Sequence, residues 1–193
     1  MSNIAIFGGT FNPFHIGHYQ MLEYVCGLDF IDRVLLIPDK IPPHKSCDFL
    51  ASDTDRIEMC RLVCNDFCKA ELCLAEFERE GKSYTVYTVN LLKKKYINDN
   101  FFTVIGGDML ATLDTWYNWQ LLIKKTAFIA FRRVGSSDFE NHLKRMQNYG
   151  AQIIVADKEI ADISSTLLRG DMRRELLPEK VYQYIKNKGI YNA

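Results

Sequence analysis

The sequence predicts an α/β fold in which helices cover both faces of a doubly wound parallel sheet. Short apolar stretches rich in β-branched and aromatic residues alternate with helix-like stretches along the whole chain. The strand-like stretches are continuous apolar runs, which is typical of strands buried on both faces. With 193 residues and no linker, low-complexity tract or internal repeat, the chain is expected to form one domain over 1–193. Its C-terminal part, from about 163 to 193, is expected to be helical.

The expected elements follow one another in strand–helix order. Strands are predicted over Ile4–Phe7, Val34–Ile37, Phe101–Ile105, Thr126–Phe131 and Gln152–Val155. Helices are predicted over Gly17–Cys26, Asp53–Cys68, Thr85–Tyr96, Leu110–Lys124, Phe139–Asn148, Ser164–Met172 and Pro178–Lys188. In a sheet of this kind, ligands bind beyond the carboxyl ends of the strands. The segments that follow the strands are therefore the candidate functional regions.

Composition excludes several classes of partner. Lysine and arginine number 24, and aspartate and glutamate also number 24, so the formal net charge is zero. A neutral chain lacks the broad positive surface of a protein that coats nucleic acid or an anionic membrane. No apolar run approaches the roughly 18 residues of a membrane helix, and the N-terminus lacks the basic region of a signal peptide. We expect a cytoplasmic protein without nucleic-acid or membrane partners.

Three of the six cysteines recur every fourth residue. Cys60, Cys64 and Cys68 fall on one stripe of a predicted helix, and the chain contains no Cys-x-x-Cys pair. The stripe could serve a soft metal or redox chemistry. We favour three small apolar residues on a buried helix face, because free cysteine packs like a small hydrophobe.

The first strand-to-helix turn is the strongest candidate site. It reads Gly8-Gly9-Thr10-Phe11-Asn12-Pro13-Phe14-His15-Ile16-Gly17-His18. The turn matches neither the dinucleotide pattern Gly-x-Gly-x-x-Gly nor the P-loop. Its two glycines allow a ligand close to the backbone, and His15 and His18 flank the positive end of the predicted helix. Backbone N–H groups, the helix dipole and two imidazoles together suit a polyphosphate.

This turn resembles the signature of a known superfamily. The pattern His-x-Gly-His after a glycine-rich first strand is that of the nucleotidyltransferases, which have a Rossmann-like fold. They transfer a nucleotidyl group from a triphosphate and release pyrophosphate. The resemblance implies that His15 and His18 contact the triphosphate and stabilise charge in the transition state. It does not identify the acceptor.

Later motifs favour one acceptor. They are Pro42-Pro43-His44-Lys45, Ser83-Tyr84-Thr85, Gly106-Gly107-Asp108, Leu113 with Trp116, Arg132-Arg133-Val134-Gly135 and Ile163-Ser164-Ser165-Thr166-Leu167-Leu168-Arg169. In this order they look like the bacterial nicotinate-mononucleotide adenylyltransferase family, which makes deamido-NAD from ATP and nicotinate mononucleotide. The resemblance extends from Ile4 to about Tyr191 and so covers nearly the whole chain.

The resemblance implies two groups of site residues. Those expected at ATP are Gly8, Gly9, Thr10, Phe11, His15, His18, Asp108, Ser164, Ser165 and Arg169, with His15 and His18 catalytic. Those expected at nicotinate mononucleotide are Lys45, Tyr84, Thr85, Trp116, Tyr117 and Arg133. Val134 replaces the family's proline, so Arg132 could take the place of Arg133. We interpret Asn12, where the family often has aspartate, as a turn former.

Several of these residues also fit plainer roles. Ser164 and Ser165 could simply cap a helix, Asp108 could be a turn aspartate, and Trp116 could belong to the core. Lys45 could be a solvated surface lysine. The family context favours the functional role for each.

The implied mechanism is a direct in-line transfer with ATP and nicotinate mononucleotide as partners. We expect Mg²⁺ to be carried with ATP, since the sequence offers no carboxylate cluster as a dedicated metal site. Two alternatives stay open. One is another adenylyltransferase, with nicotinamide mononucleotide or phosphopantetheine as acceptor, and the other is a sensor of pyridine nucleotides without catalysis. The sequence leaves the oligomeric state open, a homo-oligomer included.

Overall fold

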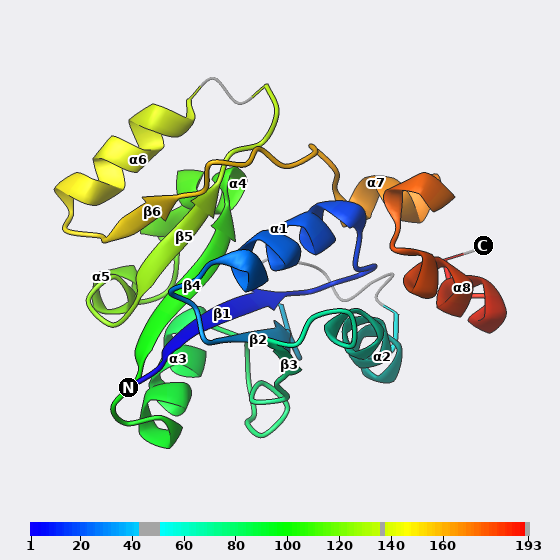
Figure 1. Cartoon of the computed structure of the whole chain (residues 1–193), viewed down its shortest axis with the longest axis horizontal. Coiled ribbons are helices and arrows are strands. Elements are labelled where there is room, and N and C mark those ends of the chain that lie inside the picture. Colours follow the sequence, from blue (N-terminus) through cyan, green and yellow to red (C-terminus); the bar gives the residue numbers. More distant parts are fainter. Residues whose placement is uncertain (43–50, 136–137, 192–193) are drawn as a thin grey trace.

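The structure is a computed structural model that describes residues 1–42, 51–135 and 138–191. Within these residues, six parallel strands form one sheet (Figure 1). The strands are β1 (Asn3–Gly9), β2 (Arg33–Pro38), β3 (Ala70–Leu72), β4 (Asn100–Gly106), β5 (Ala127–Phe131) and β6 (Ile153–Val155). The helices are α1 (Ile16–Gly27), α2 (Asp53–Cys64), α3 (Thr85–Lys95), α4 (Gly107–Ala111), η1 (Leu113–Thr115), α5 (Trp119–Leu122), α6 (Phe139–Asn148), α7 (Ser165–Gly170), η2 (Arg174–Leu176) and α8 (Glu179–Lys188).

The strands lie in the order β3-β2-β1-β4-β5-β6, and every neighbouring pair is parallel. The chain therefore starts in the middle of the sheet, extends it to one edge, and then returns to build the other half. This is the order of a doubly wound Rossmann-like sheet, and the predicted fold class is confirmed. The reversal of direction lies between β1 and β4, where such folds bind their ligands.

The four central strands, β1, β2, β4 and β5, each contribute side chains to two separate cores. Ala5 and Phe7 of β1 pack with α1, α2, α7 and α8, whereas Ile4 and Ile6 pack with α3, α4, α5 and α6. Successive side chains of a strand point to opposite faces, so an uninterrupted apolar run serves both cores. This explains why the buried strands were readable as continuous apolar segments.

Two predicted helices are wrong in extent. The helix predicted over Leu110–Lys124 is divided into α4, η1 and α5, because Trp116 is extended (ψ 146°) and Asn118 is left-handed (φ 54°). The hydroxyl of Thr115 also donates to the carbonyl of Thr112 at 2.7 Å, a local bond that competes with helix. The helix predicted over Asp53–Cys68 ends at Cys64, where turns lead into β3.

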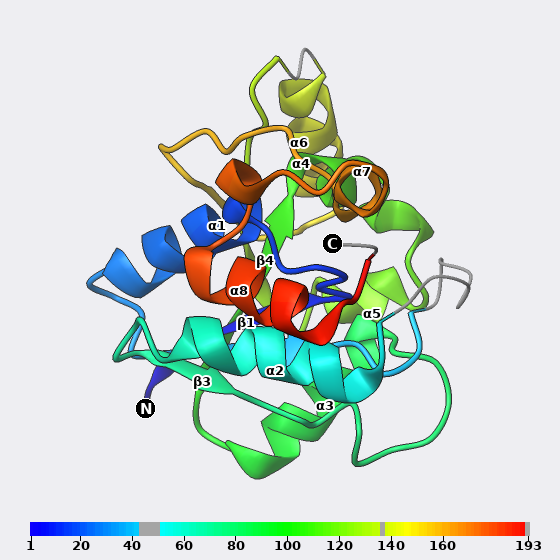
Figure 2. The same ribbon diagram turned by 90° about the vertical axis from the view of Figure 1, so that its right-hand side faces the viewer.

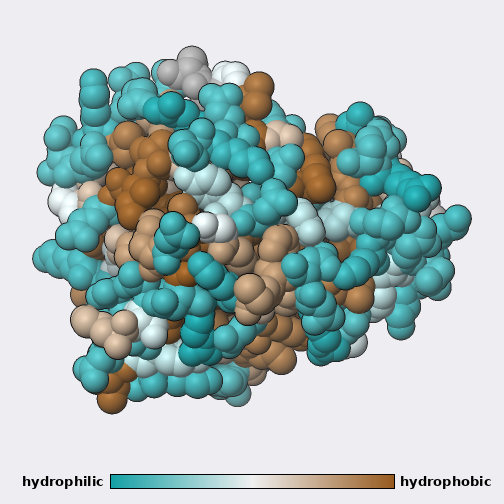
Figure 3. Space-filling model, in the orientation of Figure 1, coloured by the Kyte–Doolittle hydropathy of each residue, from teal (hydrophilic) through white to brown (hydrophobic). Residues whose placement is uncertain are grey.

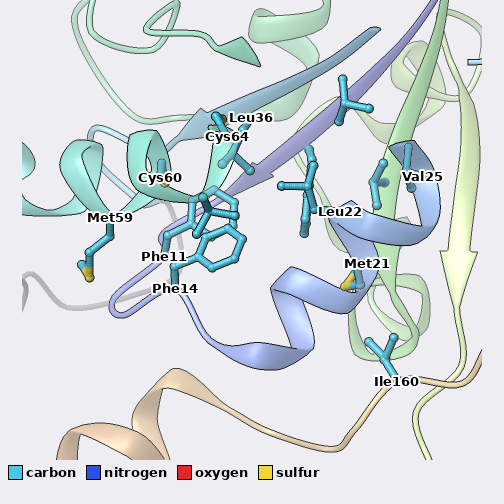
Figure 4. Close-up of a cluster of buried hydrophobic side chains, with 14 of the residues drawn as sticks. Phe11, Phe14, Met21, Leu22, Val25, Leu36, Met59, Cys60, Cys64 and Ile160 are labelled. Carbon is cyan, nitrogen blue, oxygen red and sulfur yellow. The ribbon is translucent and has the colours of Figure 1, made fainter. Parts of the chain in front are cut away.

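The shortened helix corrects the interpretation of the cysteines. Cys60 and Cys64 are buried beside Phe11 and Phe14 (Figure 4), but Cys68 lies past the helix end and is exposed. Burial raises the pKa of Cys64 to about 12, so this thiol stays protonated near neutral pH. The buried stripe therefore contains two cysteines, not three.

The last helices return to the beginning of the chain. α7 and α8 lie beyond the carboxyl end of β1 (Figure 1), and α8 packs on α2 (Figure 2). The face seen in Figure 3 carries mostly hydrophilic side chains, with apolar ones in smaller patches. Among the described residues, no helix is both long and apolar enough to span a membrane.

Candidate active site

A cavity of about 480 Å³ lies at the carboxyl ends of the central strands. Its lining comes from the ends of β1, β2 and β4 and from the starts of α1, α3 and α7. The predicted site residues that line it are Gly8, Gly9, Thr10, Phe11, His15, His18, Tyr84, Thr85, Asp108, Trp116, Tyr117, Arg133, Ser164 and Ser165. Residues from distant parts of the sequence thus meet in one cavity because parallel strands end at the same edge.

His15 and His18 cap the start of α1 reciprocally. His15 is the N-cap residue, and its Nδ1 accepts from the backbone N–H of His18 at 3.3 Å. The Nδ1 of His18 accepts in return from the backbone N–H of His15, also at 3.3 Å. A neutral imidazole that accepts through Nδ1 carries its proton on Nε2. The capping box therefore sets both rings as Nε2–H donors.

The two imidazole rings are held together as a unit. They stack with centroids 3.6 Å apart and planes inclined by 17°. The Phe11 ring packs edge-on against the His18 ring, with the two ring centroids 5.1 Å apart. His15 is buried and His18 is half-buried, yet both line the cavity. The packing restricts their rotation, which prepares a fixed site for a negatively charged ligand.

The turn before the histidines adopts an unusual backbone. Phe11 has φ 49°, a left-handed conformation that costs free energy in a residue other than glycine. Phe11 packs edge-on against Phe7. It also contacts Phe14 (Figure 4), and this packing offsets that cost. At Gly9, a Cβ atom would lie only 3.0 Å from the Phe11 ring, so a larger residue would require that ring to shift. The peptide bond between Asn12 and Pro13 is cis.

Aromatic side chains form another wall of the cavity. Tyr84, which precedes α3, stacks on Tyr117 with centroids 4.6 Å apart and planes inclined by 28°. The hydroxyl of Tyr87 donates to that of Tyr117 at 3.1 Å, and Trp116 packs partly against the core. Aromatic rings and the start of a helix thus lie side by side at this wall.

Asp108, Arg133 and Asp162 form a charged group at the ends of β4 and β5. An Arg133 nitrogen, Nη2, lies 3.0 Å from the Asp108 carboxylate, and Nη1 donates to Asp162 at 2.8 Å. Burial would lower the pKa of Arg133, but the hydrogen bond to Asp162 and the charge of Asp108 raise it above its ordinary value. Arg132 instead pairs with Glu140 and stacks over Phe139. Arg133 is therefore the arginine of this pair that lines the cavity.

The Ser-Ser-Thr segment joins the cavity to the first turn. Ser164 is the N-cap of α7, and its hydroxyl accepts from the backbone N–H of Leu167 at 3.2 Å. The Ser165 hydroxyl donates to the Pro13 carbonyl at 3.0 Å. Arg169 lies behind the lining, where its Nη1 donates to the Asn12 carbonyl at 2.8 Å. Lys45 and the neighbouring Pro43 and His44 lie outside the described residues.

Two carboxylates that were not predicted from the sequence also line the cavity. Glu76 is buried, pairs with Arg79 at 2.7 Å and accepts from the Thr88 hydroxyl. Asp39 follows β2 and accepts from the Thr10 hydroxyl at 3.4 Å. Asp39 closely follows a predicted strand, and that position could have identified it as a candidate site residue. No local sequence pattern distinguishes Glu76.

Comparisons with known proteins agree with this geometry. Residues 6–171 match the cytidylyltransferase-like family. The nicotinate-nucleotide adenylyltransferase of Bacillus subtilis (strain 168) is 35% identical, and the match covers 100% of both chains. A probable nicotinate-nucleotide adenylyltransferase of Halalkalibacterium halodurans is 36% identical, with 100% of this chain and 93% of that protein covered.

A solved structure shares the fold. Plasmodium falciparum nicotinic acid mononucleotide adenylyltransferase, complexed with APC, superposes with a TM-score of 0.83 at 22% identity. The match covers 100% of this chain and 98% of that one. With the family match over residues 6–171 and the full-length relatives, the chain belongs to the cytidylyltransferase-like family and, within it, to the nicotinate-nucleotide adenylyltransferases.

Proposed function

We propose that this chain transfers an adenylyl group from ATP to nicotinate mononucleotide, producing deamido-NAD and pyrophosphate in NAD biosynthesis. The observation that carries the proposal is one cavity with two kinds of wall. One wall presents the paired histidines at the start of α1, and the other presents aromatic side chains at the start of α3. The first suits a triphosphate and the second suits a flat charged ring. The names of the full-length relatives support the same reaction.

The chemistry requires no covalent intermediate. The 5′-phosphate of nicotinate mononucleotide is already a nucleophile near neutral pH, since the second pKa of a phosphate monoester is about 6. One of its oxygens bonds to the α-phosphorus of ATP, while the bond from that phosphorus to the β-phosphate oxygen breaks. Pyrophosphate leaves with the electron pair. Catalysis then consists of alignment and stabilisation of negative charge.

The chain's own residues divide this work. His15 and His18, with protons on Nε2, donate to the α- and β-phosphates, and their reciprocal caps prevent the rings from turning away. Ser165, which lines the cavity, serves the outer phosphates directly, whereas Arg169 lies behind the lining and supports them through its positive charge. Ser165 donates to the Pro13 carbonyl and Arg169 to the Asn12 carbonyl, both in the first turn. The residues proposed for the outer phosphates are therefore anchored to the first turn, the same segment that carries the two histidines.

The described residues fit Mg²⁺ only as part of the nucleotide. Among them, no three histidine, cysteine, aspartate or glutamate side chains gather to hold a metal ion. Mg²⁺ prefers six oxygen ligands and keeps several waters, so the triphosphate and water would supply most of them. Of the carboxylates that line the cavity, Glu76 is engaged with Arg79 and Thr88, so Asp39 and Asp108 would be the ones to hold such waters. When bound, the ion neutralises charge on the phosphates.

A three-acceptor assay tests the proposal. Purified protein with ATP is given nicotinate mononucleotide, nicotinamide mononucleotide or phosphopantetheine, and pyrophosphate release is measured with each. We expect the fastest release with nicotinate mononucleotide. Faster release with phosphopantetheine, or ATP binding without release in every case, would overturn the proposal. A cytoplasmic location stays a prediction, and the oligomeric state stays open.

A further inference from the structure

Arg56 is a charged side chain in the core, away from the cavity lining. It lies on α2 and is 0% exposed, and it is the largest fully buried side chain of the described residues. Burying a guanidinium costs free energy unless hydrogen bonds replace its water. Its Nη2 pairs with Asp53, but Nε makes no hydrogen bond within the described part of the chain. Such a residue calls for an explanation beyond core packing.

One nitrogen of Arg56 bridges two loops of the site. Nη1 donates to the Thr10 carbonyl at 3.1 Å and to the Asp39 carbonyl at 2.6 Å. Thr10 follows β1 and belongs to the turn assigned to ATP. Asp39 follows β2 and begins the acceptor segment, Asp39–Ile41, whose Lys40 and Ile41 N–H groups donate to the Ser83 hydroxyl beside Tyr84 of the aromatic wall. Thr10 and Asp39 both line the cavity. The two segments also contact each other directly, since the Asp39 N–H donates to the Gly9 carbonyl at 2.9 Å and the Thr10 hydroxyl to the Asp39 carboxylate at 3.4 Å. The Arg56 guanidinium adds a buried bridge to these contacts from behind the lining.

We propose that Arg56 is a positioning residue for the transfer, which holds the nucleotide turn and the acceptor segment rigidly against each other where the β1–β2 pairing ends. The inference rests on the proposed function, because it assumes that the two segments hold different substrates. Each segment keeps its own ligand contacts without Arg56, so binding of either substrate alone should change little. Alignment of the phosphate with the α-phosphorus should suffer, and a displacement of about 1 Å can cost roughly 100-fold in rate.

Arg56→Lys and Arg56→Met test this role. Lysine keeps the positive charge but has neither the reach nor the flat fork of arginine, so it separates geometry from charge. The matched control is Arg61→Lys, because Arg61 lies on the same helix, pairs likewise with an acidic residue three positions earlier, and is solvent-exposed. kcat and both KM values are measured at a temperature where circular dichroism shows folded protein.

We expect Arg56→Lys to lower kcat at least tenfold while both KM values change less than threefold, and Arg61→Lys to match the wild type. Arg56→Met should lower kcat at least as much. A kcat within twofold of the wild type, or a rise in KM with kcat kept, would overturn the proposal. So would failure of both Arg56 variants to fold, because the residue would then serve stability. Wild-type turnover tests the proposed function, whereas the ratio of variant to wild type tests Arg56.

Discussion

The hydroxyl of Tyr191 donates a 2.6 Å hydrogen bond to the side-chain oxygen of Asn12, 179 residues earlier in the chain. The same Asn12 oxygen accepts from the backbone N–H of Ala51 at 2.9 Å, and the Asn12 carbonyl accepts from Arg169. Burial raises the pKa of Tyr191, although Arg56 and Arg169 act in the opposite direction, so the hydroxyl stays a donor. Asn12 thus joins the first turn to α7, to the segment before α2 and to the segment after α8.

Tyr191→Phe removes only the hydroxyl from this arrangement. We expect the free energy of unfolding to fall by about 0.5–1.5 kcal/mol, the usual net contribution of one hydrogen bond. Urea denaturation of the wild type and the variant measures the change. Tyr149→Phe is the control, because Tyr149 is 54% exposed and should change stability little. Equal stability of the Tyr191 variant and the wild type would show that this bond contributes nothing.

His18→Ala tests the paired imidazoles. We expect turnover to fall by about 10²–10⁴, the range for losing one positioned donor or proton-transfer group. The turnover of His15→Ala should fall similarly. Its free energy of unfolding should also fall by about 0.5–2 kcal/mol, because the substitution removes the N-cap of α1. Initial rates of pyrophosphate release are compared at a temperature where each variant is folded.

The control for the histidine variants is His142→Ala, because His142 lies on α6 and outside the cavity lining. It should keep normal turnover. Near-normal turnover in both the His15 and the His18 variants would contradict the mechanism, since no other pair of donors has been assigned to the α- and β-phosphates.

Most strands could be predicted because burial on both faces requires a short continuous run of apolar residues. β1, β2, β4 and β5 are central and buried, so each reads as an apolar run. β3 is an edge strand of three residues, Ala-Glu-Leu, without full burial, and no local pattern marks it. The break between α4 and α5 depends on the left-handed Asn118, a conformation that a helix-compatible sequence conceals.

Site residues could be predicted where they directly follow a strand. Residues that reach the cavity through packing between distant segments could not. The first turn and Asp108 stand directly after strands, so their convergence follows from the sheet. Glu76 is buried by partners that only the folded chain brings together. Arg56 did leave a signal, because it stands four and eight residues before Cys60 and Cys64 on the same apolar stripe of α2. A charge on such a stripe indicates a buried hydrogen-bonding role.

The cysteines allow a matched pair of substitutions. Cys64→Ser buries a hydroxyl and should lower the free energy of unfolding by about 1–3 kcal/mol. Cys68→Ser changes an exposed thiol and should stay within about 0.5 kcal/mol of the wild type. Denaturant unfolding under reducing conditions measures both. Equal effects of the two substitutions would contradict the assignment of Cys64 to the core, and zinc bound stoichiometrically and lost with Cys64→Ser would contradict it as well.

The charge of the acceptor's ring gives the last prediction. Nicotinate mononucleotide carries a carboxylate where nicotinamide mononucleotide carries a neutral amide. The proposed ring site adjoins the start of α3 after Tyr84, and the first N–H groups of a helix favour an anion. Charge-assisted hydrogen bonds are about twice as strong as neutral ones. An amide would turn its NH₂ toward those donors and leave a polar group unpaired, at a cost of about 1–3 kcal/mol.

We therefore expect kcat/KM to favour the acid at least tenfold, and up to about 10⁴-fold. Asp114 stands close in sequence to Trp116 but does not oppose this preference. Its carboxylate accepts from Arg145 at 3.1 Å, and it is not part of the cavity lining. Asp114→Asn should accordingly leave the ratio of the two kcat/KM values unchanged. Side-by-side kinetics with both mononucleotides measure that ratio, and equal efficiency or preference for the amide would mean that the ring binds elsewhere.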